Sequence, residues 1–303
     1  MSITTINGKI NGVQLGKTYI HEHLKIDLSA HKKDLDTKFD DTDAVITEMK
    51  ILKDNGIDTI VEVTNRGMGR DVKAMKRIAE ASGINIIVST GFYKEPYLPS
   101  YVYEMEEKEL SQLLLQDIFT GIDGTDIKAH VIGEVGTSKD TITPVEFKML
   151  KVAARTHLET GKPISTHTTL GTMAIEQLKF FAEYGVNLAK VVIGHVDLNC
   201  ELDYHLRIAD TGCFMAFDTI GKLKYQSDQK RIESIKQLIY RGHLDQIVLS
   251  QDITRRSHLK VNGGIGYCYL IDTFIPKLLE SGVNKKHVEQ MLVFNPQRLL
   301  EVK

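Results

Sequence analysis

Short apolar runs alternate with segments of helical spacing along the whole chain. The strand-like runs cover residues 17–22, 57–64, 84–90, 128–134, 162–168, 190–196, 213–218 and 246–252. Between them, apolar residues recur at helical spacing, as in Ala44, Ile46, Met49 and Leu52. Eight such units in 303 residues predict a closed (β/α)8 barrel, also called a TIM barrel. An open doubly wound sheet is the alternative, and it would need a switch-point crevice to gather the polar residues described below.

Residues typical of helix starts and ends fall between these runs. Residues 143–146 (Thr-Pro-Val-Glu) have the form of a capping box with proline at the first helical position. Pairs typical of helix ends precede three of the runs: Asn55-Gly56, Ser82-Gly83 and Thr160-Gly161. No linker interrupts the pattern. We therefore expect residues 1–303 to form a single barrel domain, with extra helices over residues 265–303 and a small lid at the foot of the barrel from the first sixteen residues.

The charge balance narrows the classes of partner. The chain has 38 Lys and Arg against 40 Asp and Glu, a formal net charge of -2, and basic residues are scattered among acidic ones. This balance argues against nucleic acid as a partner. The N-terminal segment does not resemble a signal peptide, and no apolar stretch reaches about 18 residues. Cys200, Cys213 and Cys268 form no C-x-x-C pair, which suits a reducing compartment. These features predict a cytoplasmic protein without membrane contact.

Six side chains of metal-ligand type stand at or near the ends of five strand-like runs. They are His21, His23, Glu134, His167, His195 and Asp252, in KTYIHEHL, AHVIGEVG, KPISTHT, VVIGHVDLN and QIVLSQDIT. Alternate residues of a strand share a face, so His21 and His23 point one way and Glu22 the other. In a barrel the C-terminal strand ends meet at one rim, where active sites are built. Each residue taken singly is also explained as a core histidine or an ion-paired carboxylate, but their convergence predicts a metal centre.

The ligand types narrow the metal and the chemistry. Imidazole and carboxylate groups without cysteine suit zinc, manganese, cobalt or iron, with zinc as the default. Four histidines and two carboxylates exceed the needs of one tetrahedral zinc ion, which favours two divalent metal ions with a bridging carboxylate. Two metals would convert a bridging water into hydroxide at neutral pH. The reaction implied is attack on an electrophilic carbonyl or phosphorus centre.

Motifs along essentially the whole chain resemble those of the phosphotriesterase family of the amidohydrolase superfamily. They are HEHLKIDLS, EVTNRGMGR, GIDGTDIKA, PISTHT, GHVDL, FDTIGK, DITRRSHLKVNGG and FNPQRLL. The resemblance implies a distorted (β/α)8 barrel with two metal sites: His21, His23 and Asp252 at the more buried metal, His167 and His195 at the more exposed one, and Glu134 as the bridge. It also implies that Asp252 is the catalytic residue, which accepts a proton from the attacking hydroxide and delivers one to the leaving group.

Glu134 separates this chain from many members of that family. Those members bridge their metals with a carbamylated lysine at the end of the fourth strand, whereas another branch of the family has glutamate there. Lys128 lies six residues before Glu134, roughly 20 Å away along an extended strand, so it cannot take this role. The resemblance therefore points away from phosphotriester hydrolysis as the native task.

Candidate substrate contacts follow other strand-like runs. Tyr93 resembles in position the tyrosine with which lactonases of the family contact the substrate carbonyl, and packing within its loop is the alternative. Those lactonases have an arginine where this chain has Thr219, which argues against acyl-homoserine lactones. Arg255 and Arg256 could hold a phosphate or carboxylate of the substrate, or form structural salt bridges. Lys222 is a further candidate for the same anion.

The residues and the resemblance together favour a metal-dependent hydrolase of a small lactone, ester or amide, with an anionic or phosphorylated substrate as one form of this hypothesis. Phosphoester or phosphotriester hydrolysis is the second hypothesis. A barrel that binds metal or a metabolite without hydrolysis is the third, and the complete ligand set together with Asp252 argues against it. The expected partner is a small-molecule substrate, and a homodimer is a common arrangement in the family.

Overall fold

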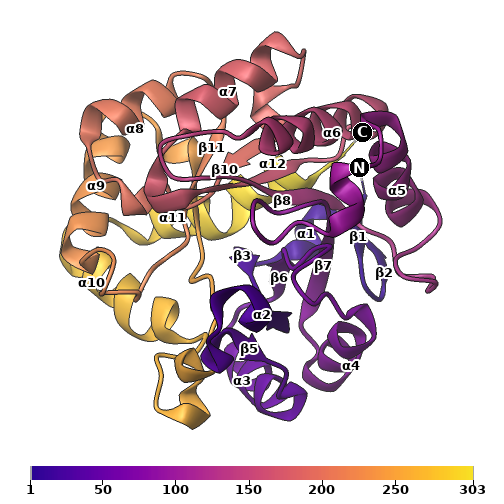
Figure 1. The fold of residues 1–303 in the computed structure, drawn as a ribbon. Helices are drawn as coiled ribbons and strands as arrows, with labels where there is room; N and C mark the ends of the chain where they lie inside the picture. The colour runs from indigo at the N-terminus through magenta and orange to yellow at the C-terminus, as the bar shows by residue number, and fades with distance from the viewer. Residues whose placement is uncertain (1, 303) are drawn as a thin grey trace.

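Eight parallel strands form one curved sheet in the computed structural model, which describes residues 2–302 (Figure 1). The strands are β3 (Thr18–Glu22), β6 (Thr59–Glu62), β7 (Asn85–Thr90), β8 (Val131–Thr137), β9 (Ile164–Thr168), β10 (Val191–Ile193), β11 (Phe214–Phe217) and β12 (Ile247–Leu249). Neighbours in the sheet follow the order of the chain from β3 to β12. The sheet is a nearly closed barrel, so the predicted TIM-barrel fold is confirmed.

Helices surround the barrel and connect its strands (Figure 1). They are α3 (Thr42–Asp54), α4 (Val72–Ser82), α5 (Glu107–Phe119), α6 (Pro144–Thr160), α7 (Ala174–Glu183), α8 (Leu202–Ala209) and α9 (Asp228–Tyr240), followed by α10 (Ile275–Glu280), α11 (Lys285–Glu289) and α12 (Asn295–Leu300). The predicted capping box begins α6: Thr143 Oγ1 accepts from the Glu146 N–H at 3.3 Å, and the Glu146 carboxylate accepts from the Thr143 N–H at 3.0 Å. This reciprocal pair explains why the helix starts where the sequence predicted.

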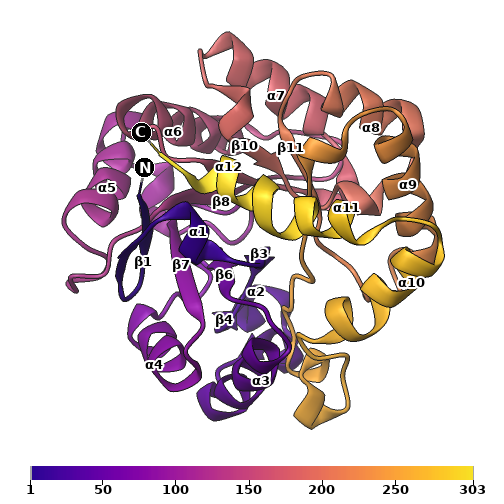
Figure 2. The ribbon, with the colours of Figure 1, turned by 180° about the vertical axis from the view of Figure 1, so that it is seen from behind.

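Residues 2–16 cover the N-terminal end of the barrel. They contain β1 (Ile3–Thr5), β2 (Gly8–Ile10) and α1 (Gly12–Leu15), and α12 lies beside them (Figure 2). Ile3 and Leu15 join Leu299 and Leu300 in one buried cluster with the residues that fill the barrel interior: Ile20, Val61, Val63, Ile87, Val131, Val192, Phe214, Ala216 and Val248. A larger apolar cluster lies between the strands and the outer helices. The foot of the barrel is therefore closed by apolar packing, and the opposite rim is left for function.

The last strand of the barrel, β12, and the first, β3, are connected differently from the other neighbouring strands. Within residues 2–302, β12 and β3 share no backbone ladder. Instead, the His21 N–H donates to Ser250 Oγ at 3.1 Å, and Ser250 Oγ–H donates to the Glu22 carboxylate at 2.8 Å. Side chains thus bridge this seam.

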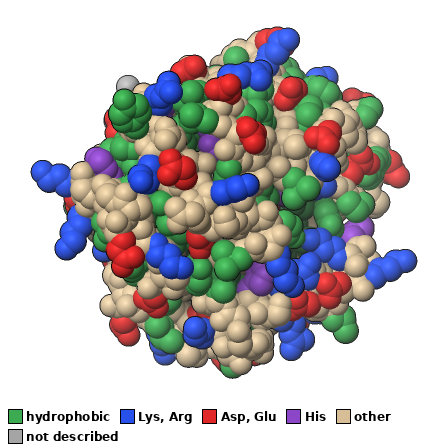
Figure 3. Space-filling view, turned by 90° about the vertical axis from the view of Figure 1, so that its left-hand side faces the viewer, with side chains coloured by type: hydrophobic (Ala, Val, Ile, Leu, Met, Phe, Trp, Pro, Cys, Tyr) green, Lys and Arg blue, Asp and Glu red, His purple; other side chains and the backbone are tan. Residues whose placement is uncertain are grey.

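The outer surface is mixed in character. Figure 3 shows Lys and Arg side chains interspersed with Asp, Glu and apolar side chains over one face. Across residues 2–302, every helix is too short or too polar to cross a membrane.

Candidate metal centre

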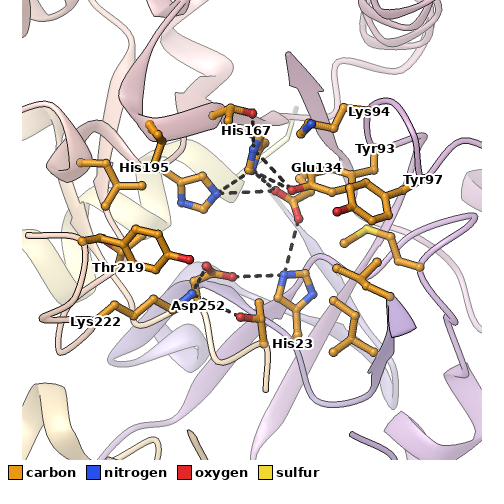
Figure 4. Close-up of a pocket in the computed structure, with 18 of the residues that line it drawn as sticks. His23, Tyr93, Lys94, Tyr97, Glu134, His167, His195, Thr219, Lys222 and Asp252 are labelled. Atoms are coloured by element: carbon orange, nitrogen blue, oxygen red, sulfur yellow. Dashed lines mark hydrogen bonds and ion pairs between the residues drawn. The ribbon is translucent and has the colours of Figure 1, made fainter. Parts of the chain in front are cut away.

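The six predicted ligand side chains converge at the C-terminal rim of the barrel. They come from β3 or the turn after it (His21, His23), β8 (Glu134), β9 (His167), and the turns after β10 (His195) and β12 (Asp252). All except His21 line a cavity of about 260 Å³ (Figure 4). His21 is buried and its Nε2 lies 3.6 Å from Glu134 Oε2. The strand ends thus bring together the residues that the sequence pattern predicted as a group.

His195 and Asp252 lie beyond β10 and β12, because these two strands end earlier than the sequence predicted. His195 has φ 60° and Asp252 has φ 53°, so both are in the left-handed region that non-glycine residues rarely adopt. Such conformations persist where surrounding contacts hold them, and they are concentrated at functional sites. The backbone turn, rather than strand alternation, aims these two side chains into the cavity.

Glu134 lies between all four histidines. Its Oε2 is 3.4 Å from His167 Nδ1 and 3.9 Å from His195 Nε2. Its Oε1 is 3.5 Å from His23 Nε2, on the other side of the carboxylate. Figure 4 shows the carboxylate between His23 on one side and His167 and His195 on the other. A carboxylate in this position can bridge two cations.

Two groups of three buried residues could each hold a metal ion, since their ligand atoms lie within 4.8 Å of one another. The groups are His21, Glu134 and His195, and His21, His23 and Asp252. His23 Nε2 lies 3.3 Å from Asp252 Oδ1. Next to the first group, His167 Nδ1 lies 2.8 Å from His195 Nε2. These groups overlap with the predicted ligand sets, although they divide the residues differently.

Unsatisfied buried atoms support a fit to metal. Within residues 2–302, His21 Nε2 and Glu134 Oε2 are buried without a hydrogen-bond partner. Buried polar atoms are normally paired, so such atoms need an explanation, and an ion is one. Burial lowers the pKa of His167 to about 4, which leaves this imidazole neutral and able to donate a lone pair at neutral pH. Burial acts to raise the pKa of Glu134, but the surrounding histidines hold it well below its usual range, so this group is an anionic carboxylate.

Asp218 orients two of the histidines, and the sequence interpretation did not select it. This fully buried residue follows β11 directly. Its Oδ1 accepts from His195 Nδ1 at 2.8 Å, and its Oδ2 lies 3.2 Å from His21 Nδ1. Such partners fix the tautomer and ring orientation of a ligating histidine and leave Nε2 for the metal. Asp218 ends an apolar run just as the predicted ligands do, so the same signal was available to find it.

Glu62 and Thr64 orient His23 in a similar way, and they also were not predicted. The Thr64 hydroxyl lies 2.7 Å from His23 Nδ1 and 2.6 Å from Glu62 Oε1. Because the Thr64 hydroxyl donates its hydrogen to the Glu62 carboxylate, its oxygen can only accept a hydrogen bond from His23. Nδ1 of His23 therefore carries the proton. These two hydrogen bonds again leave Nε2 of the histidine facing the centre.

Tyr93 and Lys222, which the sequence suggested as substrate contacts, lie in the wall of the cavity. The Tyr93 hydroxyl is 3.2 Å from His167 Nδ1, and the two rings meet edge to face. The Lys222 ammonium donates to the second carboxylate oxygen of Asp252. Both side chains can therefore reach a molecule bound beside the ligand cluster.

Arg255 and Arg256 do not line the cavity, so the structure does not support them as substrate contacts. The Arg255 guanidinium pairs with Asp34 at 2.7 Å and with Asp36 at 3.4 Å. Arg256 begins a short helical turn away from the cavity wall. Arg255 thus forms the structural salt bridges that were the alternative to a substrate contact, because the chain turns at Asp252 and carries the next loop outwards.

The rest of the wall is mostly apolar or cationic. Lys32 and Lys94 line the mouth, together with Tyr97 and Tyr225. The apolar lining comes from Ile26, Leu28, Met68, Leu170 and Leu198. Apart from the two carboxylates of the ligand set, the wall that the described residues form contains no acid. The site can thus accept a small, partly apolar molecule, and its mouth favours negative charge.

Comparisons with known proteins agree with this geometry. A model of the phosphotriesterase family matches residues 1–300. The chain is 45% identical over 286 residues to the phosphotriesterase homology protein of Escherichia coli, which covers 94% of this chain and 98% of that protein. A crystal structure of that protein, described as complexed with phosphate in its active site, aligns with a TM-score of 0.94 at 44% identity over 95% of this chain and 99% of that one.

Two further relatives have named activities. The chain is 34% identical to an N-acetyltaurine hydrolase of Dictyostelium discoideum over 277 residues, which is 88% of this chain and 75% of that protein. A lactonase from Listeria monocytogenes aligns over 100% of both chains, with a TM-score of 0.96 and 31% identity. Because the family model spans nearly the whole chain and these relatives match most of it, this chain is a hydrolase of the phosphotriesterase family.

Proposed function

We propose that this protein is a metal-dependent hydrolase that uses two divalent ions to cleave a small lactone, ester or amide. The observation that carries this proposal is the position of Glu134, whose two carboxylate oxygens face histidines on opposite sides, His23 at 3.5 Å and His167 at 3.4 Å. A single tetrahedral ion needs fewer ligands than this site offers.

The resemblance to the phosphotriesterase family supplies the ligand assignment. His21, His23 and Asp252 would hold one ion, His167 and His195 the other, and Glu134 both. When bound, such a pair of ions acidifies a water molecule and polarises the oxygen of the scissile group. Zinc is the default, and manganese, cobalt and iron suit the same donors.

The chain's own residues handle protons and orient the substrate. Asp252 borders the cavity, and its carboxylate is placed to take a proton from the attacking water and return it to the leaving group. Burial raises the pKa of Tyr93 well above its usual value, so this phenol stays protonated and can donate a hydrogen bond to a substrate oxygen. Lys32, Lys94 and Lys222 favour a substrate that bears a negative group.

The named activities of the relatives support carbonyl chemistry. One hydrolyses an acetylated amine and another is a lactonase. A second candidate, phosphoester hydrolysis, is favoured by the phosphate in the active site of the Escherichia coli relative. Both reactions use the same ligand set, so only substrate turnover separates them.

The test is a substrate panel assayed with protein loaded in turn with zinc and manganese. The panel should contain lactones, N-acetyl amino acids, N-acetyltaurine, and phosphomonoesters to triesters. We expect turnover of a carbonyl substrate, about two metal ions per chain, and loss of metal in Glu134→Ala. Turnover of phosphoesters alone would favour the second candidate. A protein that binds no metal when it is supplied in excess would contradict the proposal.

A further inference from the structure

Glu22, the middle residue of the His-Glu-His motif, faces away from the metal centre. It is fully buried at the end of β3, and its carboxylate points into the seam between β3 and β12. Within residues 2–302, Glu22 forms no ion pair with a cationic side chain, because all its partners are hydrogen-bond donors of residues 250–253. A buried carboxylate without a cation is costly unless its hydrogen bonds are well made.

Four donors converge on this carboxylate. Oε1 accepts from Ser250 Oγ–H at 2.8 Å, from the Gln251 N–H at 2.7 Å and from the Asp252 N–H at 3.3 Å. Oε2 accepts from the Ile253 N–H at 3.0 Å. Three consecutive backbone N–H groups around a left-handed residue form an anion-binding concavity, and here the anion is a side chain of the protein itself.

These hydrogen bonds connect the end of β3 to the turn after β12, in place of a backbone ladder between the two strands. They also fix the backbone at Asp252, whose φ of 53° is held by few other backbone contacts. The Asp252 side chain leaves this turn on the opposite side and brings Oδ1 to 3.3 Å from His23 Nε2. The Glu22 carboxylate therefore contacts one side of the turn, and the Asp252 carboxylate extends from the other side towards His23.

We propose that Glu22 is a positioning residue for Asp252: its carboxylate holds the 251–253 backbone so that the Asp252 carboxylate stays within reach of the attacking water and the leaving group. The inference rests on the proposed acid–base role of Asp252. A displacement of about 1 Å at such a group can cost on the order of 100-fold in rate.

The informative variant is Glu22→Gln. The amide has nearly the same shape, but its nitrogen is a donor and cannot accept from an N–H. One oxygen must then serve both Gln251 and Ile253, which face different ends of the group, so the turn shifts. The matched control is Glu48→Gln. Glu48 in α3 is also buried, and it accepts from the backbone N–H groups of Lys260 at 2.6 Å and Tyr267 at 3.0 Å, which belong to the same long loop. Glu48 itself does not contact the predicted metal ligands.

The readout is the dependence on the leaving group. The metal-loaded variants are assayed with the acetate esters of 4-nitrophenol and of ethanol. Nitrophenolate departs without a proton, whereas ethoxide needs one, so a misplaced Asp252 should slow the ethyl ester about 10-fold more. A purely structural defect lowers the active fraction and slows both esters equally, as we expect for Glu48→Gln. In an Asp252→Asn background, Glu22→Gln should leave the ratio of the rates on the two esters unchanged.

An equal loss on both esters in Glu22→Gln would overturn the inference. If the wild-type protein cleaves neither ester, the proposed function is in question, and a crystal structure of Glu22→Gln still decides the role of Glu22. We expect Asp252 to leave its left-handed conformation and its carboxylate to move away from His23. A turn that superposes on the wild-type turn would overturn the inference whatever the reaction is.

Discussion

Oδ1 of Asp218 accepts a hydrogen bond from Nδ1 of His195 at 2.8 Å, and it also accepts from the backbone N–H of that residue at 2.9 Å. The same carboxylate reaches Nδ1 of His21 at 3.2 Å through its other oxygen. One side chain therefore fixes one histidine of each proposed metal position, and both histidines face Oε2 of Glu134. Removing it should affect both proposed metal positions together.

Asp218→Asn should lower metal affinity about 10- to 100-fold, because the amide no longer fixes both imidazoles with Nε2 towards the centre. Competition with a chromophoric chelator measures this. Asp117→Asn is the control: this carboxylate is equally buried, but it pairs with Arg66 and Arg70. The control should lose stability while the folded protein keeps its metal affinity. Equal affinities for Asp218→Asn and the wild-type protein would contradict the role of Asp218.

Lys222→Met should shift the acid limb of kcat/KM to higher pH. Burial acts to raise the pKa of Asp252, but the Lys222 ammonium and nearby histidines hold it well below its usual range. Without the ammonium the pKa rises, so the carboxylate is protonated and lost as a base at a higher pH. Lys224→Met, an exposed change on the same loop, should leave the profile unchanged. A profile of Lys222→Met that coincides with the wild-type profile would show that the pair does not control this group.

Tyr93→Phe tests the phenol in the cavity wall. The change removes the hydroxyl that lies 3.2 Å from His167 Nδ1 but keeps the ring packed edge to face on that imidazole. We expect kcat/KM to fall about 10-fold, as for the loss of one hydrogen bond to the substrate, with metal content unchanged. Tyr97→Phe, in the same wall, is the comparison. If Tyr93→Phe instead lost metal, the hydroxyl would serve the ligand and not the substrate.

Strand ends allowed the convergence of these six residues at one rim to be predicted from the sequence. Parallel strands in a barrel all end at one rim, so a polar residue that closes an apolar run is placed there by the fold alone. Asp218 ends the apolar run of β11 in the same way. Its role in orienting two histidines was missed because the resemblance does not name it as a metal ligand.

Loop directions could not be predicted in this way. Arg255 stands three residues after Asp252, but its partner Asp34 is 221 residues away in sequence. Nothing local in the sequence indicates that the chain turns at Asp252 with φ 53° and carries Arg255 outwards. The alternation of side chains along a strand correctly placed Glu22 opposite the two histidines. Its partners, however, lie in the turn after β12 and depend on how the barrel closes. Side chains whose partners come from distant loops need the tertiary structure.

Arg231 is a fully buried cation that anchors the loop after β11. Its Nε donates to Asp197 at 2.7 Å, and its terminal nitrogens donate to Asp228 and Thr219 at 2.9 Å. Arg231→Met should cost about 3–5 kcal/mol, because two buried carboxylates lose their cation. Urea denaturation measures this cost. The exposed control Arg207→Met should stay within about 0.5 kcal/mol of the wild-type protein, and a similarly small effect at Arg231 would mean that the carboxylates find other partners.

His130 joins both ends of the chain to the foot of the barrel. Its Nδ1 accepts from the Thr4 N–H at 3.1 Å and from Lys162 Nζ at 2.9 Å, and its Nε2 donates to the Leu300 carbonyl at 2.7 Å. Burial, followed by the nearby Lys162 charge, lowers the pKa of His130 to about 3. The folded state therefore keeps this imidazole neutral.

Stability should consequently decline on acidification. The unfolded chain binds a proton at His130 near its ordinary pKa of about 6.5, while the folded chain does so only near 3. Protons favour unfolding between these values, so stabilisation that is complete above pH 6.5 is lost as the pH falls towards 3, on the order of a few kcal/mol. His130→Gln cannot take the proton, so its urea midpoint should fall less steeply over this range although it starts lower. Parallel pH dependences for the two proteins would contradict the buried, neutral state of His130.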